Sequence, residues 1–252
     1  MDFSSVPNDS LMGRVLRAPL ALIPKRARIP VLHGPLRGAY WIAGAHTHGC
    51  WLGSYEADKQ RAFARLAYPG QVIYDVGANA GFYTLLASRL CGPSGRVVAF
   101  EPLPRNVALL REHVRLNRAD NVTVLDVAVS DEPGIARFNT SLDSAQGRIA
   151  GDGDLEVRAT TLDAIVRDRI APPPQLIKMD IEGGELSALQ GAAEILRQHK
   201  PLILLATHGP EVHRACIALL RAAGYSLTAL DTQSVETTDE ILANPIDAPR
   251  AV

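Results

Sequence analysis

The sequence has few cysteines, almost no net charge and no long apolar run. Its three cysteines, Cys50, Cys91 and Cys216, are far apart, which argues against a disulfide framework or a CxxC metal site and fits a reducing cytoplasm. With 26 basic and 27 acidic residues the net charge is -1, so no overall field attracts nucleic acid or a membrane surface. The apolar run at residues 11–24 is interrupted by arginines and is too short to span a bilayer. We therefore expect a cytoplasmic protein with no stable membrane insertion and no nucleic-acid partner.

The chain is long enough for one α/β domain with a terminal extension. Of its 252 residues, 47% are hydrophobic, and a chain of this kind buries a substantial core. We predict a main domain over residues 70–252. Residues 1–69 are predicted as an N-terminal extension that packs on the main sheet and can lie across the mouth of its site, with a helix from about Glu56. The sequence gives no indication of the oligomeric state.

Strand and helix patterns alternate from about residue 71, which is typical of a mostly parallel sheet covered by helices on both faces. Strands are predicted at residues 71–76, 96–102, 121–129, 175–181, 201–207 and 225–230. Residues 131–160 interrupt this alternation with a segment rich in Ser, Asp and Gly, which we interpret as an insertion over one face of the sheet, a lid or binding loop. The last twenty residues are polar and are predicted as edge structure and tail.

The stretch VIYDVGANAGFYT, residues 72–84, indicates a buried strand, a glycine turn and the start of a helix. In dinucleotide-binding proteins this turn reads G-x-G-x-x-G, because backbone amides must approach a pyrophosphate. Here Asp75, Gly77 and Gly81 give D-x-G-x-x-x-G, so the pyrophosphate spacing is missing and an aspartate would repel an anion. The sign of this charge favours a cationic ligand such as S-adenosylmethionine.

Two further carboxylates follow the next two predicted strands. Glu101 can accept two hydrogen bonds from a ribose diol, a contact that dinucleotide enzymes also use. Asp126 could meet an adenine amino group or could be an ordinary turn residue at a strand end. The glycine turn has structural readings as well, since Gly77 could simply permit a positive φ and Asp75 could cap the following helix.

Five ordered blocks over roughly residues 71–207 resemble the FkbM family of S-adenosylmethionine-dependent methyltransferases. The blocks are DVGANAGFYTLLASRL, VVAFEPLPRNVALLREHVRLN, NVTVLDVAVSD, TTLDAIV and LIKMDIEGGELSALQGA. The resemblance implies a class I (Rossmann-like) methyltransferase fold, with a seven-stranded sheet that contains one antiparallel strand. It also implies methylation of a hydroxyl on a sugar, a polyketide or another small metabolite.

The resemblance also implies roles for individual residues. It assigns Asp75, Gly77, Asn79 and Thr84 to the methionine end of the donor, Glu101 to its ribose and Asp126 to the neighbourhood of its adenine. One departure lies at the end of the fifth strand, where the sequence reads LLATHG and the family often has a glutamate-containing motif. This departure affects the acceptor side of the site more than the donor side.

Three residues at the ends of the fourth and fifth strands are candidates for the catalytic step. His208 is the predicted general base, because its ordinary pKa is near neutral. Asp180 could orient it or bind substrate hydroxyls, and Glu182 is a second candidate base. The alternative for His208 is a histidine at a helix entry that bonds the backbone. The three could also gather a hard cation, but their spacing is not diagnostic and no metal is predicted.

The motif HTHGC places His46, His48 and Cys50 at alternate positions, but without a fourth ligand it indicates ordinary loop chemistry. The sequence therefore predicts a methyltransferase that uses S-adenosylmethionine to methylate a hydroxyl of a small molecule or glycan. Two alternatives stay open, a dinucleotide-dependent oxidoreductase and a non-catalytic module that binds S-adenosylmethionine.

Overall fold

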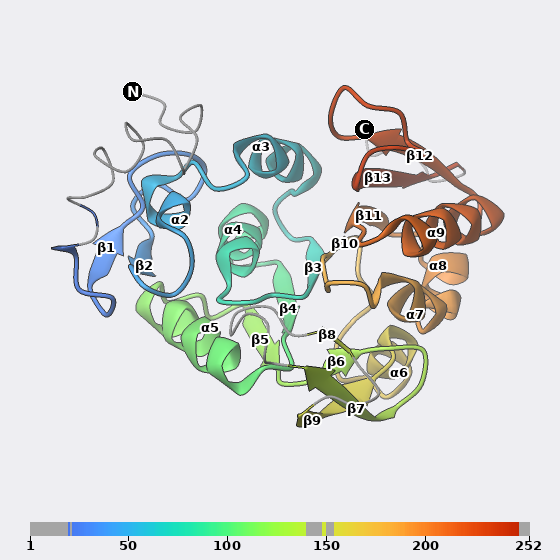
Figure 1. The fold of residues 1–252 in the computed structure, drawn as a ribbon, viewed down its shortest axis with the longest axis horizontal. Helices are drawn as coiled ribbons and strands as arrows, with labels where there is room; N and C mark the ends of the chain where they lie inside the picture. Colours follow the sequence, from blue (N-terminus) through green and yellow to red (C-terminus); the bar gives the residue numbers. More distant parts are fainter. Residues whose placement is uncertain (1–19, 21, 140–147, 150–153, 247–252) are drawn as a thin grey trace.

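The structure is a computed structural model that describes residue 20 and residues 22–139, 148–149 and 154–246. A seven-stranded sheet forms its centre, in the order β12-β13-β11-β10-β3-β4-β5 (Figure 1). The strands are β3 (Val72–Val76), β4 (Arg96–Phe100), β5 (Val122–Leu125), β10 (Leu176–Met179), β11 (Leu202–Ala206), β12 (Tyr225–Ala229) and β13 (Glu240–Pro245). Only β13 among them runs antiparallel to its neighbours. The predicted class I architecture is confirmed.

Helices cover both faces of this sheet, which explains why its inner strands are almost continuously apolar. The helices of the main sheet are α4 (Phe82–Cys91), α5 (Pro104–Leu116), α6 (Leu162–Arg167), α7 (Glu185–Gln190), α8 (Ala193–Gln198) and α9 (Pro210–Ala222). Alternate strand residues point to opposite faces. Tyr74 and Ile177 therefore pack in one core with α6 to α9, whereas Ile73 and Leu176 pack in a second core with α4.

The N-terminal segment joins the second core. It contains the antiparallel strands β1 (Arg28–Pro30) and β2 (Tyr40–Ile42), followed by α2 (His48–Leu52) and α3 (Ala57–Leu66). Trp41 and Phe63 from this segment are buried in the same cluster as Leu86 of α4. The helix expected from about Glu56 is present as α3. None of the helices in the described part of the chain has the length and apolar character needed to cross a bilayer.

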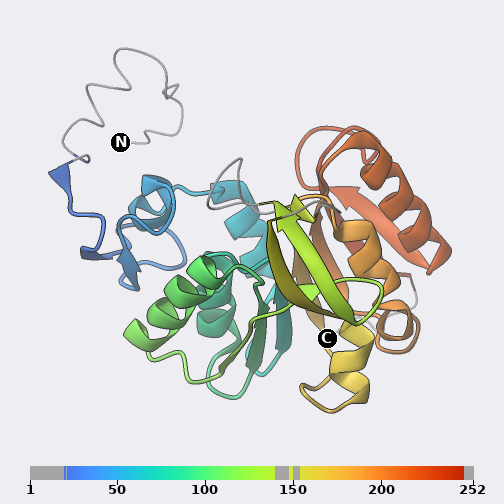
Figure 2. The same cartoon turned by 60° about the horizontal axis from the view of Figure 1, so that its bottom comes forward.

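The predicted insertion forms a second, small sheet in the order β6-β9-β7-β8, with β6 (Ala128–Val129), β7 (Gly134–Asn139), β8 (Arg148–Ile149) and β9 (Leu155–Thr160) (Figure 2). The prediction of one strand over residues 121–129 is wrong, because the chain leaves the main sheet after Leu125 and pairs with β9 instead. Residues 140–147 and 150–153 of the predicted loop lie outside the described residues. Its role as a lid stays a prediction.

The prediction of edge structure near the C-terminus is also wrong. Strand β13 lies inside the sheet, hydrogen-bonded to β11 on one side and to β12 on the other. Its alternate residues Ile241 and Ala243 are fully buried, and the residues between them are only partly buried. An interior strand with so few large apolar side chains has a weak hydrophobic pattern, which is why the sequence suggested an edge.

Candidate active site

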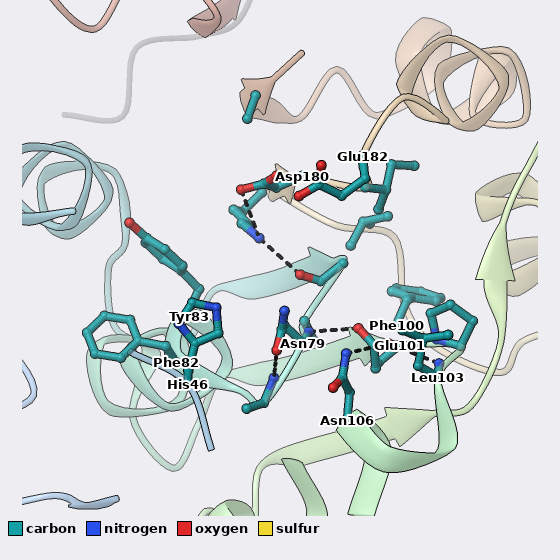
Figure 3. Close-up of a pocket in the computed structure, with 18 of the residues that line it drawn as sticks. His46, Asn79, Phe82, Tyr83, Phe100, Glu101, Leu103, Asn106, Asp180 and Glu182 are labelled. Carbon is teal, nitrogen blue, oxygen red and sulfur yellow. Dashed lines mark hydrogen bonds and ion pairs between the residues drawn. The ribbon is translucent and has the colours of Figure 1, made fainter. Parts of the chain in front are cut away.

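A cavity of about 430 Å³ opens at the carboxyl ends of β3, β4, β10 and β11. Strand order reverses between β3 and β10, and ligands of open α/β sheets bind at such a reversal. The turn after β3, the residues that follow the other strands, the N-terminal segment and Phe138 of β7 form its wall. Figure 3 shows part of this lining, with Asn79 of the turn, Glu101 after β4 and Asp180 after β10. The volume is in the range of small-molecule sites.

The turn after β3 is held between its two neighbouring strands. The backbone amides of Gly77 and Ala78 donate to the Phe100 carbonyl at 3.1 and 3.0 Å. Gly77 has a φ of +80°, and a Cβ atom on it would lie 1.9 Å from the Asp180 carbonyl oxygen. Glycine is therefore required by both conformation and space. Gly77 and Asn79, which follows at a φ of 49°, both line the cavity.

Asp75 and Thr84 lie beneath the turn. The Thr84 hydroxyl donates to the Asp75 carboxylate at 2.6 Å, both side chains are buried, and neither belongs to the cavity lining. Lys178 places its ammonium 3.5 Å from the other Asp75 oxygen. Because the Asp75 charge is paired with Lys178 and neither side chain lines the cavity, direct contact of these two side chains with a ligand stays a prediction that their position does not support. The two residues support the turn instead.

Glu101 lies at the end of β4 and faces the cavity. Its carboxylate accepts hydrogen bonds from the amides of Asn79 at 2.8 Å and Leu103 at 3.0 Å, and from the Asn106 side chain at 3.3 Å (Figure 3). Burial raises the pKa of Glu101, and these hydrogen bonds oppose the shift. A carboxylate has about four acceptor positions, so one remains for a ligand after these three bonds.

Asp126 is not part of the cavity lining. Its side chain is 51% exposed and pairs with Arg158 at 3.1 Å and with Arg111 at 3.7 Å. The chain turns away from the main sheet at this residue, and two arginines hold the carboxylate at the surface. That Asp126 meets an adenine ring therefore stays a prediction that its position does not support. The adjacent residues Val127 and Ala128 line the cavity instead.

Asp180, Glu182 and His208 come together at the ends of β10 and β11. The His208 Nε2 atom lies 3.7 Å from Asp180 Oδ1 and 3.6 Å from Glu182 Oε2. Its Nδ1 atom is 2.8 Å from the carboxylate of Glu185, which is fully buried. The hydrogen bond to Glu185 raises the pKa of His208 against the effect of burial, and Glu182 adds to this rise. The alternative of a backbone-bonded histidine is not what the structure contains.

Sequence reasoning missed Lys59, a buried lysine of α3 that connects the N-terminal segment to the cavity. Its ammonium lies 2.7 Å from Glu240, 3.4 Å from Glu56 and 3.5 Å from Asp180. Burial by itself would lower the pKa of Lys59, but the carboxylates of Asp180, Glu56 and Glu240 raise it overall. A lysine at a buried position of an amphipathic helix is the one sequence signal that could have pointed to this contact.

Replacing Lys59 with methionine is expected to lower the free energy of unfolding by about 2 kcal/mol, because three carboxylates lose a shared counter-ion at a site that water only partly reaches. Urea denaturation measures the change. The control is Arg61→Met, on the exposed face of the same helix, with an expected change of less than about 0.5 kcal/mol. Equal effects of the two substitutions would contradict a structural role for the Lys59 contacts.

The HTHGC motif supplies two lining residues, His46 and Cys50. The Cys50 sulfur lies 3.8 Å from His46 Nδ1, and burial raises the pKa of Cys50 to about 12. The thiol is therefore neutral at physiological pH and a poor metal ligand. His48 starts α2 and does not line the cavity.

Known proteins are similar to this chain in sequence. Residues 75–227 match the family model of the methyltransferase FkbM domain. Hexuronic acid methyltransferase AglP of Haloferax volcanii is 29% identical over 145 residues, which cover 56% of this chain and 58% of that protein. The 31-O-demethyl-FK506 methyltransferase FkbM of Streptomyces tacrolimicus is 27% identical over 196 residues, which cover 64% and 75%.

A third relative, 2-O-methyltransferase NoeI of Sinorhizobium fredii, is 28% identical over 151 residues, which cover 52% of this chain and 61% of that protein. The chain thus matches less than two thirds of the length of AglP and NoeI. The family model, in contrast, covers more than half of this chain. The chain belongs to the methyltransferase FkbM domain family.

Proposed function

We propose that the protein transfers a methyl group from S-adenosylmethionine to a hydroxyl oxygen of a small molecule or glycan. The charge of the cavity carries this proposal. Among the described lining residues, six have a carboxylate and two have an ammonium; the carboxylates belong to Glu56, Glu101, Asp180, Glu182, Asp239 and Glu240, and the ammonium groups to Lys59 and Lys178. This excess of negative charge attracts a ligand with a sulfonium and an amino group and repels a pyrophosphate, which opposes the oxidoreductase alternative.

The donor fits the part of the cavity near β3 and β4. The remaining acceptor position of Glu101 suits a ribose hydroxyl. Gly77 and Asn79 form the adjacent turn, where the methionine end would lie. Leu103 and Val127, beyond Glu101, offer apolar surface for the adenine ring. When bound, S-adenosylmethionine supplies a methyl group whose bond to sulfur breaks as the bond to the acceptor oxygen forms, with the electron pair left on sulfur and the hydroxyl proton released.

The acceptor hydroxyl would lie near Asp180, Glu182 and His208. These residues follow β10 and β11, beside the turn that would hold the methyl donor, and methyl transfer needs this alignment more than it needs any one base. The role of His208 as general base stays a prediction. Its Nδ1–H group can donate to Glu185, which leaves the lone pair of Nε2 directed toward the two other carboxylates.

The names of the relatives support an oxygen acceptor. One is a hexuronic acid methyltransferase, another acts on 31-O-demethyl-FK506 and a third is a 2-O-methyltransferase. These acceptors differ widely, so the family does not fix the acceptor of this chain. We also retain the proposals of a cytoplasmic location, of no nucleic-acid partner, and of an N-terminal cover over residues 1–69 on a main domain over residues 70–252.

The test compares two titrations of the purified protein by calorimetry. S-adenosylhomocysteine should bind and NAD should not; binding of NAD alone would reject the proposal. A cell extract incubated with the protein and methyl-labelled S-adenosylmethionine should then yield a labelled product. Binding of S-adenosylhomocysteine without any labelled product from extracts of several sources would favour the non-catalytic module.

Within this test, Glu101→Gln is expected to weaken the binding of S-adenosylhomocysteine at least about tenfold, because an amide nitrogen cannot accept the hydrogen bonds that the carboxylate accepts. Glu211→Gln, an exposed residue of α9 outside the cavity lining, makes the same chemical change and serves as the control. Circular dichroism establishes that both variants are folded. A folded Glu101→Gln protein with unchanged affinity would remove Glu101 from the ligand site.

A further inference from the structure

We propose that Asp180, Glu182 and His208 form a binding site for a divalent first-row metal ion of the Mn²⁺ type. The site lies at the acceptor end of the cavity, and its role in catalysis rests on the proposed methyl transfer, whereas its occupancy does not. Each of the three residues offers one ligand atom, and these atoms all lie within 4.8 Å of one another. The sequence predicted no metal, because a spacing of residues 180, 182 and 208 matches no metal motif.

The two distances that involve His208 suit one ion. With metal–ligand bonds of about 2.1 Å, two neighbouring ligands lie roughly 3 Å apart and two opposite ligands roughly 4 Å apart. The His208 Nε2 atom is 3.7 Å from Asp180 Oδ1 and 3.6 Å from Glu182 Oε2, between these limits. Both distances exceed that of a hydrogen bond. All three side chains are partly exposed and line the cavity, so an ion and its remaining ligands can reach them.

Glu185 orients the imidazole in the way that metal sites require. A histidine that binds a metal through one ring nitrogen usually donates its other N–H group to a carboxylate. Here His208 Nδ1 lies 2.8 Å from the fully buried Glu185 carboxylate. This bond fixes the tautomer with the proton on Nδ1 and directs the lone pair of Nε2 toward Asp180 and Glu182.

The same carboxylate fixes the loop that carries Glu182. Glu185 accepts hydrogen bonds from the backbone amides of Gly183 at 3.0 Å and Ile181 at 3.4 Å. Glu182, between them, has a φ of 58°, a conformation that costs energy for a residue other than glycine. One buried group therefore positions two of the three ligands, and it does so without occupying the site.

The lysines of the cavity leave room for a cation. Lys59 and Lys178 approach the Oδ2 atom of Asp180, at 3.5 and 3.9 Å, whereas Oδ1 faces His208. The two oxygens of Asp180 are thus divided between ammonium groups on one side and the proposed ion on the other. On the second side, the carboxylates of Glu182 and Glu185 lie around the His208 ring, and both would attract a divalent ion.

The ligand set selects the class of ion. Two carboxylates and one imidazole are a mixed oxygen and nitrogen set, which suits Mn²⁺ better than Mg²⁺ or Ca²⁺, the ions that favour oxygen alone. Three protein ligands leave about three positions of an octahedron open toward the cavity. An acceptor hydroxyl bound to the ion in one of these open positions would have a lower pKa than the free hydroxyl and would lose its proton to water more readily. In that case His208 is a ligand, and the predicted role as general base is replaced.

The experiment titrates the full-length protein with Mn²⁺ alone and follows the decrease of the free-ion signal by electron paramagnetic resonance. We expect one ion per chain, and at least about a tenfold weaker affinity in Glu182→Gln and in His208→Gln. Glu211→Gln, on the exposed surface of α9, is the matched control and should bind like the wild type. Absence of binding at millimolar Mn²⁺, or equal affinity in all four proteins, would overturn the proposal.

The titration with S-adenosylhomocysteine keeps this proposal separate from the proposed function. If the wild type binds S-adenosylhomocysteine but not Mn²⁺, the metal site fails and the methyltransferase proposal stands. If it binds Mn²⁺ through Glu182 and His208 but does not bind S-adenosylhomocysteine, the metal site stands and the methyltransferase proposal fails. Circular dichroism establishes that both variants are folded, so that a loss of Mn²⁺ affinity reports on the site and not on unfolding.

Discussion

Replacing Gly77 with alanine is expected to lower the free energy of unfolding by about 3–5 kcal/mol and to abolish binding of S-adenosylhomocysteine. A Cβ atom at this position would lie 1.9 Å from the carbonyl oxygen of Asp180 and 2.8 Å from the Ile181 side chain. Both neighbours belong to the chain just after β10, and a backbone carbonyl cannot rotate away as a side chain can. The turn and the end of β10 would have to move apart. Because both border the cavity, its floor would be distorted.

Gly38→Ala separates the effect of space from the effect of backbone conformation. Gly38 has a φ of +84°, close to the +80° of Gly77, but a Cβ atom on it would meet nothing within 4 Å. Only the cost of a left-handed backbone remains, about 1 kcal/mol. Urea denaturation of the two variants gives the comparison. If Gly77→Ala lowers the free energy of unfolding no more than Gly38→Ala does, the close approach of β3 and β10 is not the reason that position 77 requires glycine.

The parts of the fold that the sequence predicted are those with strong local patterns. Strands β3, β4, β10 and β11 are mostly apolar on both faces, with Asp75 and Lys178 as the interior exceptions, so each stands out as a short apolar segment. Strand β13 has only two large or medium apolar residues, Ile241 and Leu242, next to alanine, asparagine and proline. Its place inside the sheet depends on pairing with β11 and β12, and such long-range contacts leave no local signal.

In the candidate site, too, the features with a local sequence signal were predictable and those that depend on long-range contacts were not. Gly77, Glu101 and Asp180 line one cavity, because the carboxyl ends of parallel strands meet at one edge of the sheet. The direction of a side chain is harder to predict. Asp75 was expected to face the ligand, but it points to Lys178 on the neighbouring strand, with which it is in register. Lys59 was missed because two of its three partners, Asp180 and Glu240, are far away in the sequence.

The second large effect concerns His113, a fully buried residue of α5. Its Nδ1 atom lies 2.7 Å from the Ala80 carbonyl of the glycine turn, and its Nε2 accepts from the Ile42 amide of β2 at 2.9 Å. The ring also stacks on Trp41 with centroids 3.9 Å apart. His113 thus connects the N-terminal segment to the turn that borders the cavity. A proton on Nε2 would break the bond to Ile42.

Burial lowers the pKa of His113 from 6.5 to about 4 in the folded protein, although the Ala80 carbonyl and Glu112 oppose the shift. Below about pH 6.5 the unfolded chain therefore binds a proton that the folded chain does not. The resulting stabilisation is complete above this pH, decreases as the pH falls, and is lost by about pH 4. Two and a half pH units correspond to about 3 kcal/mol. Between about pH 6.5 and about pH 4, protonation linked to His113 alone should lower the wild-type free energy of unfolding by this amount.

His113→Gln removes the titration and keeps the geometry of both hydrogen bonds, because the glutamine amide can donate to Ala80 and accept from Ile42. Denaturation at several pH values should give a curve for this variant that is flatter than the wild-type curve by about 3 kcal/mol between about pH 7 and about pH 4. The control is His33→Gln, an exposed histidine, which should leave the slope unchanged. The comparison uses slopes, so a loss of stability in His113→Gln from weaker stacking on Trp41 does not affect it. Parallel curves for His113→Gln and the wild type would contradict a neutral buried imidazole at this position.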